Sequence, residues 1–143
     1  MGSRKVLPCL CRCDSAALEV RRREEEQRQF DIRVRNLKSI GLTESRFYEW
    51  RFENDNGTTP KLSLARRYVE NWKEMQSKNI GYVIMGPVGT GKSFFAGCIA
   101  NALMEQGIRV MMTNFSRILN ELTKYHADKN EILENLVSYP LLI

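Results

Sequence analysis

One glycine-rich stretch has the residue types and spacing of a phosphate-binding loop, Gly86-Pro87-Val88-Gly89-Thr90-Gly91-Lys92-Ser93. It matches Gly-x-x-x-x-Gly-Lys-Ser at every specified position. Its glycines let the backbone turn sharply, so that amide groups reach a phosphate without an intervening side chain. Lys92 is expected to contact the β and γ phosphates as the catalytic residue, and Ser93 to bind Mg²⁺ through its hydroxyl. The loop therefore predicts a site for a nucleoside triphosphate, ATP being the preferred one, with Mg²⁺.

The residues around this loop predict the elements that hold it. The predicted nucleotide contacts are the eight loop residues and Phe94, which opens the following helix. An apolar strand before the loop and an amphipathic helix after it are the context that the motif requires. Strands and helices then alternate, which indicates a parallel α/β sheet of the P-loop NTPase class with flanking helices, left incomplete in its third strand. The expected order is strand Gly81–Met85, helix Lys92–Gln106 stopped by Gly107, strand Ile108–Thr113, helices from Phe115 and over Asn130–Ser138, and strand Tyr139–Ile143.

The chain upstream of the loop divides into three parts by composition. Residues 1–14 hold a cysteine cluster, residues 15–60 form a charged helix and a linker, and residues 61–143 begin the nucleotide-binding domain. The charged helix is expected over residues 15–38, with Arg21/Glu25 and Arg22/Glu26 one turn apart. The linker contains an aromatic group and an Asp55-Asn56-Gly57 turn. A helix over 62–77 is expected to bury the stripe Ala65, Tyr68, Val69, Trp72 and Met75.

Three cysteines, Cys9, Cys11 and Cys13, crowd the amino-terminal part. Such crowding suits a metal site better than a disulfide framework, and it marks these residues as candidates for a partial Zn²⁺ site. A structural zinc site uses four ligands, commonly from two separated pairs. Because the cluster supplies three, free cysteines are the favoured interpretation.

Charge and hydropathy narrow the class of protein and its partners. The net charge of +5 favours an anionic partner, whether nucleotide, nucleic acid or acidic protein surface. No apolar run approaches the roughly 20 residues of a membrane span, and no signal peptide is evident, so a cytoplasmic location without membrane contact is expected. Single-stranded DNA contacts are a hypothesis, with an ordinary solvated surface as the alternative. The candidate DNA-contacting residues are Arg66, Arg67, Lys73, Lys78, Phe115, Lys124 and Tyr125, and the single histidine, His126, is expected to be exposed.

ATP hydrolysis needs acids that the sequence does not offer in the expected place. In P-loop enzymes one carboxylate binds Mg²⁺ and another orients water at the end of a neighbouring apolar strand. The acids after the loop are instead expected in helices or their connections, at Glu105, Glu121, Asp128, Glu131 and Glu134.

The stretch GYVIMGPVGTGKSFFAGCIANALMEQGIRVMMTNFSRILN, residues 81–120, resembles the DnaC/DnaI-type helicase-loader ATPases, an AAA+ family to which the IstB transposition helper is related. The segment FYEWRFENDNG and the cysteine cluster are similar to the linker and the zinc element of these loaders. The resemblance implies an ATPase core that binds a replicative helicase and single-stranded DNA. It also implies that the Walker B acids, the sensor and the arginine finger of the family lie beyond residue 143.

The leading hypothesis is an ATP-binding DNA replication protein in which nucleotide gates contacts with a helicase and single-stranded DNA. An IstB-like transposition helper is the first alternative. A truncated module that binds ATP without hydrolysing it is the second. An uncovered edge of the sheet also favours self-association.

Overall fold

The structure, a computed structural model, describes residues 12–57, 59, 61–124 and 128–143, and it divides into two compact units at Arg33/Val34. The first unit, as far as it is described, is the amino-terminal part of helix α1, Arg12–Gly41. Its side chains from Ser15 to Arg33 are all exposed. Pairs one turn apart support the helix, including the predicted Arg22–Glu26 ion pair at 3.5 Å, whereas Glu25 pairs with Arg28 at 3.7 Å. Exposed pairs of this kind each contribute about 0.3–0.5 kcal/mol.

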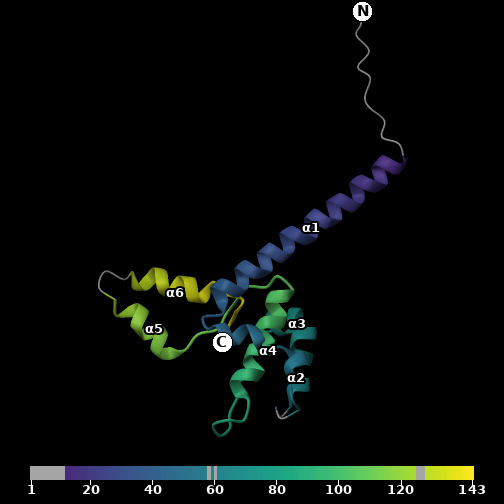
Figure 1. The fold of residues 1–143 in the computed structure, drawn as a ribbon. Helices are drawn as coiled ribbons and strands as arrows, with labels where there is room; N and C mark the ends of the chain where they lie inside the picture. Colours follow the sequence, from purple (N-terminus) through teal and green to yellow (C-terminus); the bar gives the residue numbers. More distant parts are fainter. Residues whose placement is uncertain (1–11, 58, 60, 125–127) are drawn as a thin grey trace, which may run out of the picture. The chain divides into compact units, whose positions relative to one another are not determined.

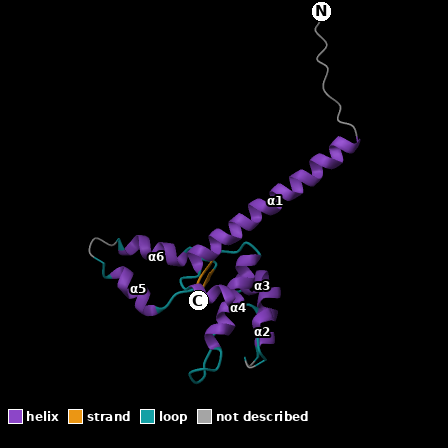
Figure 2. Cartoon of the chain, in the orientation of Figure 1, coloured by secondary structure: helices purple, strands orange, loops and turns teal. Residues whose placement is uncertain are grey.

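The second unit is mostly helical, with a small parallel sheet (Figures 1 and 2). Helix α4 lies at its centre and α2 packs along it. After the end of α1 the elements are the 3-10 helices Ser45–Glu49 and Phe52–Asn54, helices α2 (Leu62–Glu70), α3 (Trp72–Ser77) and α4 (Lys92–Glu105), strand β1 (Val110–Met111), helices α5 (Phe115–Leu122) and α6 (Lys129–Val137), and strand β2 (Leu141–Leu142).

The hydrophobic core is built around α4, which is buried on most of its surface. Leu103 and Met104 are fully buried, and the predicted stripe of α2 faces them with Ala65, Tyr68 and Val69. Helix α4 begins and ends close to the residues predicted for it. Gly107, at φ 81°, ends it in a Schellman arrangement, because Ile108 N donates to Leu103 O and Gly107 N to Met104 O.

The helix expected over 62–77 is two helices, separated at Asn71. The Asn71 side-chain amide donates to Arg67 O at 2.8 Å. Asparagine side chains compete in this way with backbone hydrogen bonding and interrupt a regular helix. The apolar stripe nevertheless continues across the break, since Trp72 is buried and Met75 half-buried.

Two of the three expected strands are present, and both are shorter than predicted. β1 and β2 pair in parallel with Val110 opposite Leu141 and Met111 opposite Leu142. An isolated parallel bridge joins Leu42 to Met112, the residue after β1. The chain just after α1 therefore pairs with the residue that follows β1, which the sequence did not indicate.

The prediction of a strand at Gly81–Met85 is wrong for this structure. The segment is not assigned to a strand, and Val83 and Met85 are each 85% exposed. A strand exists through ladder hydrogen bonds to a neighbour, and none of the described strands pairs with this segment. Side chains hold it instead, because Tyr68 donates to Ile80 O at 2.9 Å and Tyr82 to Leu64 O at 3.3 Å. Burial raises the pKa of Tyr68, so its hydroxyl keeps the donated proton.

The carboxyl-terminal end of α1 belongs to the second unit and makes close contacts within it. Gly41 lies so near β1 that a Cβ there would be 2.1 Å from Val110 O. One turn earlier, the buried Lys38 makes an ion pair with Glu105, at the end of α4, with Nζ and Oε1 2.6 Å apart. Within the part of the chain that the structure describes, no helix is both long and apolar enough to cross a membrane.

Candidate functional site: the P-loop and its cavity

The loop of residues 86–91 turns sharply before α4, as the motif predicts. Gly89 and Gly91 adopt φ of 84° and 76°, a left-handed conformation that other residues rarely take. Gly91 is also the N-cap of α4, and no side chain caps this end of the helix. The backbone N–H groups of the first turn, with their partial positive charge, are thus directed into the loop.

Lys92 curls back into the loop that precedes it. Its Nζ donates to Gly86 O at 2.8 Å and to Pro87 O at 2.5 Å. Thr90 also donates to Pro87 O, at 2.9 Å. These bonds place the ammonium at the centre of the loop, where the motif predicts phosphate contacts.

The residues present fit a triphosphate with Mg²⁺. An anion bound in the loop would meet three kinds of donor: the uncapped N–H groups of α4, the backbone of the glycine loop and the Lys92 ammonium. This combination of donors suits phosphate oxygens. The Ser93 side chain lies in the first turn of α4 and is exposed, so its hydroxyl is accessible to a metal ion. Among the described residues no group of three or more His, Cys, Asp or Glu could hold a metal by itself. A bound Mg²⁺ would therefore need phosphate oxygens and water besides Ser93.

A cavity of about 460 Å³ opens beside the loop. One wall is the backbone of the loop with Lys92, and the other combines α2 with the segment before the loop. The second wall includes Leu64 and Tyr82, and Phe95 of α4 also lines the cavity, so this part of the lining is largely apolar. A polar wall opposite an apolar one is the usual arrangement of a small-molecule site.

Two residues of this cavity, Thr59 and Lys61, were not predicted from the sequence. A Cβ placed on Gly91 would be 3.0 Å from Thr59 Oγ1, so the linker touches the loop. Lys61 adopts φ 59° immediately before α2 and lines the same cavity as Lys92. No local pattern marks either residue, because the contact joins segments far apart in the sequence.

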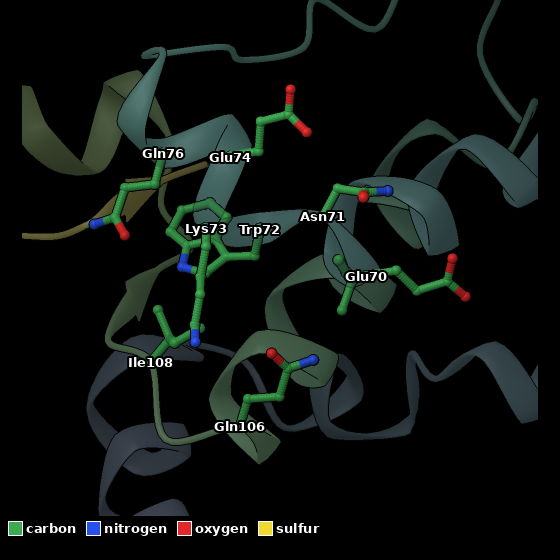
Figure 3. A pocket seen from close by; sticks show the side chains of 9 residues that line it. Glu70, Asn71, Trp72, Lys73, Glu74, Gln76, Gln106 and Ile108 are labelled. Carbon is green, nitrogen blue, oxygen red and sulfur yellow. The ribbon is translucent and has the colours of Figure 1, made fainter.

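A second cavity, of about 670 Å³ and thus larger than the one beside the loop, lies at the junction of α2 and α3 (Figure 3). Figure 3 shows Trp72 and Lys73 near the middle of the view, with Gln76 to the left, Glu70 to the right and Gln106 below. None of the loop residues lines it. Size alone does not make a nucleotide site, and the loop cavity has the donors that phosphate requires.

The basic residues proposed for DNA contact lie in different environments. Arg66 stacks on Phe52, with its guanidinium 4.5 Å from the ring centroid, and Lys78 pairs with Glu74 at 2.6 Å. That pair lowers the pKa of Glu74 through a hydrogen bond and the nearby charge. Lys124 pairs with Glu121, at 2.5 Å. Phe115 is 74% exposed. Several of the described candidates thus make intramolecular contacts.

Other predicted positions fall outside what the structure describes. Cys9, Cys11, Tyr125 and His126 lie outside the described residues, and Cys13 is placed only as part of the α1 backbone. The fourth cysteine, Cys98, is buried in α4. Burial raises the pKa of the Cys98 thiol to about 12, which makes it an inert core residue.

The acids that follow the loop lie in helices or at their ends, as expected. Glu105 is the last residue of α4, and Asp128 is the N-cap of α6, accepting from the backbone N of Asn130 and Glu131. Glu121 belongs to α5, and Glu131 and Glu134 to α6. None of these acids directly follows β1 or β2.

A glycine-rich loop at the start of a buried helix that packs on a small parallel sheet is compatible with part of a P-loop NTPase domain of the α/β class. A protein-family model described as "IstB-like ATP binding protein" matches residues 15–143, and the chain belongs to this family. No significant match was found among curated proteins or among solved structures. This match is consistent with the expected AAA+ ATPase family that includes IstB and DnaC-type proteins. It does not assign the chain to the DnaC type in particular.

Proposed function

We propose that the chain binds ATP with Mg²⁺ at the P-loop and uses the bound nucleotide to control contacts with DNA and a protein partner. The observation that carries this proposal is the position of the Lys92 ammonium, which lies inside the loop at 2.8 Å from Gly86 O. The same loop ends at the uncapped start of α4. The family match over residues 15–143 supports ATP as the nucleotide.

Each residue of the loop has a separate part in binding. The N–H groups of the loop and of the first turn of α4 orient the phosphates, and Lys92 neutralises their charge. The Ser93 hydroxyl holds Mg²⁺, which would supply charge stabilisation to the phosphate oxygens. The apolar wall with Leu64, Tyr82 and Phe95 excludes water from one side of the ligand.

The partner defines two versions of this proposal. The resemblance of residues 81–120 to DnaC-type loaders favours a replicative helicase and single-stranded DNA. The family match favours an IstB-like helper that works with a transposase. The genes next to the coding sequence distinguish them, since replication genes support the loader and a transposase gene supports the helper.

Removal of the loop cation tests ATP binding. Lys92→Ala is expected to weaken Mg-ATP binding at least about 100-fold in isothermal calorimetry, because it removes a charge-assisted contact of about 1.5–3 kcal/mol and the charge that neutralises the phosphates. Lys73→Ala, on α3 and outside the loop cavity, is the matched control and should bind as the unmodified chain does. Equal affinities for Lys92→Ala and the unmodified chain would contradict the proposal.

A further inference from the structure

Trp50, in the linker, rests directly on the backbone of α4. A Cβ placed on Gly97 would lie 2.4 Å from Trp50 Cε3 and 2.9 Å from Trp50 Cβ. Only glycine leaves room for the ring at this point of the helix. Because Gly97 has no side chain, the Trp50 ring can lie directly against the helix backbone.

A buried polar contact holds the linker in this register. Asn101, one turn after Gly97 and 1% exposed, donates through Nδ2 to Phe47 O at 2.7 Å and to Trp50 O at 3.0 Å. Buried amide bonds are costly to break because the carbonyls would lose their partner away from water. The middle of the 3-10 helix Ser45–Glu49 and the residue that follows it are thus fixed to α4.

Aromatic contacts continue from Trp50 to the start of α4. The Trp50 and Phe94 rings meet edge to face, with centroids 6.5 Å apart, and Phe47 packs on the other side of Trp50 at 4.6 Å. The Arg46 guanidinium lies 5.8 Å from the centre of the Trp50 ring. Phe94 directly follows Lys92 and Ser93 in the first turn. The ring of Trp50 therefore touches the turn that carries both loop side chains.

We propose that Trp50 is a positioning residue for the nucleotide site. By packing on Phe94 and Gly97 it sets the rotation of the first turn of α4, and with it the directions of Lys92 and Ser93. This inference rests on the proposed function, the binding of Mg-ATP at the loop. Binding groups must be held to within about 0.5 Å of their working positions to act together. The proposed contact of Ser93 with Mg²⁺ depends most on this geometry, so a loosened first turn of α4 would weaken it first.

The position of Trp50 in the fold distinguishes a positioning role at the first turn of α4 from the role of an ordinary core residue. Trp50 is half-buried and packs against the edge of the core, while α2 covers the middle of α4 through residues such as Ala65 and Val69. A change at Val69 removes core contacts on α2 and leaves the Trp50–Phe94 contact in place. Val69→Ala is thus a matched destabilising control, because its effect on stability is not linked to the first turn.

The test compares affinity for ATP with and without Mg²⁺ by calorimetry, at a temperature where every variant is folded by circular dichroism. Trp50→Ala is expected to weaken Mg-ATP binding about tenfold and to reduce the gain in affinity that Mg²⁺ provides. Trp50→Phe should restore most of both, since an aromatic ring can still pack on Phe94. Val69→Ala should leave the affinity and its Mg²⁺ dependence unchanged despite lower stability.

The outcomes distinguish this inference from the proposed function. If the unmodified chain binds no ATP, the proposed function fails. If it binds ATP but Trp50→Ala binds with the same affinity, or if Val69→Ala weakens binding as much, the positioning role is overturned. Should Trp50→Ala not fold, Phe94→Leu replaces it, because leucine keeps apolar volume in the first turn but removes the ring contact. Unchanged Mg²⁺-dependent affinity in Phe94→Leu then also overturns the inference.

Discussion

The Lys92 ammonium donates to two carbonyl oxygens of its own loop, Gly86 O and Pro87 O. These are neutral acceptors. Hydrogen bonds from an ammonium to an ionised acceptor are roughly twice as strong as neutral ones, so a phosphate oxygen competes well for the same protons. On the proposed function, the loop would therefore orient Lys92 before a nucleotide binds, which would reduce the entropy lost on binding.

Cys98 leads to a prediction about reactivity. Burial raises the pKa of its thiol from 9.0 to about 12, which lowers the thiolate fraction at pH 8 about a thousandfold. Because the thiolate is the nucleophile, folded Cys98 should react with iodoacetamide far more slowly than a free thiol does. Mass spectrometry of a variant with Ser at positions 9, 11 and 13 measures this rate. The reaction should become fast in denaturant, and fast alkylation of the folded chain would contradict the prediction.

The same pKa shift has a consequence for stability. Below pH 9.0 the thiol is neutral in both folded and unfolded chains, so Cys98 has no pH-dependent effect. Above it, the unfolded chain ionises first and the folded state loses stability as the pH rises towards 12. Cys98→Ala removes this contribution, so the variant should lose less unfolding free energy across this range than the unmodified chain.

At the scale of elements, the junction of α1 with the sheet is held by close backbone contact. Gly41→Ala would place a Cβ 2.1 Å from Val110 O, and the strand or the end of α1 must shift to relieve the overlap. We expect a loss of about 3 kcal/mol in unfolding free energy, measured by urea titration.

Gly81→Ala is the control for this change. No atom lies within 4 Å of a Cβ placed on Gly81, and its φ is not positive. It should therefore leave the urea midpoint nearly unchanged. A Gly41→Ala variant as stable as Gly81→Ala would show that the end of α1 does not lie against β1 in solution.

Sequence patterns predicted the elements whose cause is local. The ends of α4 follow from Gly91 and Gly107, each a signal within one helical turn. The break at Asn71 was missed because the apolar stripe keeps its helical period across it. The strand at Gly81–Met85 was predicted from its apolar residues, whereas strand formation depends on a neighbour that no local pattern reveals.

At the scale of the whole molecule, the site combines one local motif with long-range contacts. The motif predicted residues 86–93 because glycine, lysine and serine at fixed spacing are enough to shape the loop. Thr59 and Trp50 of the linker, and Lys61 just after it, reach the loop cavity or the first turn of α4 through contacts that depend on how the chain packs. The sequence indicated only a connection here, whereas Thr59 lines the loop cavity and Trp50 packs on α4.

Because the loop is continuous with the central helix of the core, nucleotide binding should stabilise the whole second unit. Both tryptophans of the chain, Trp50 and Trp72, belong to this unit, so their emission reports its unfolding. Mg-ATP at 100 times its dissociation constant is expected to raise the unfolding free energy by about 2.7 kcal/mol, provided that the unfolded chain does not bind it. Urea titration at several ATP concentrations measures the increase, which should be absent in Lys92→Ala. A urea midpoint that does not depend on ATP, or that rises equally in Lys92→Ala, would mean that the nucleotide does not bind through the loop, since binding to the folded state alone must shift the equilibrium.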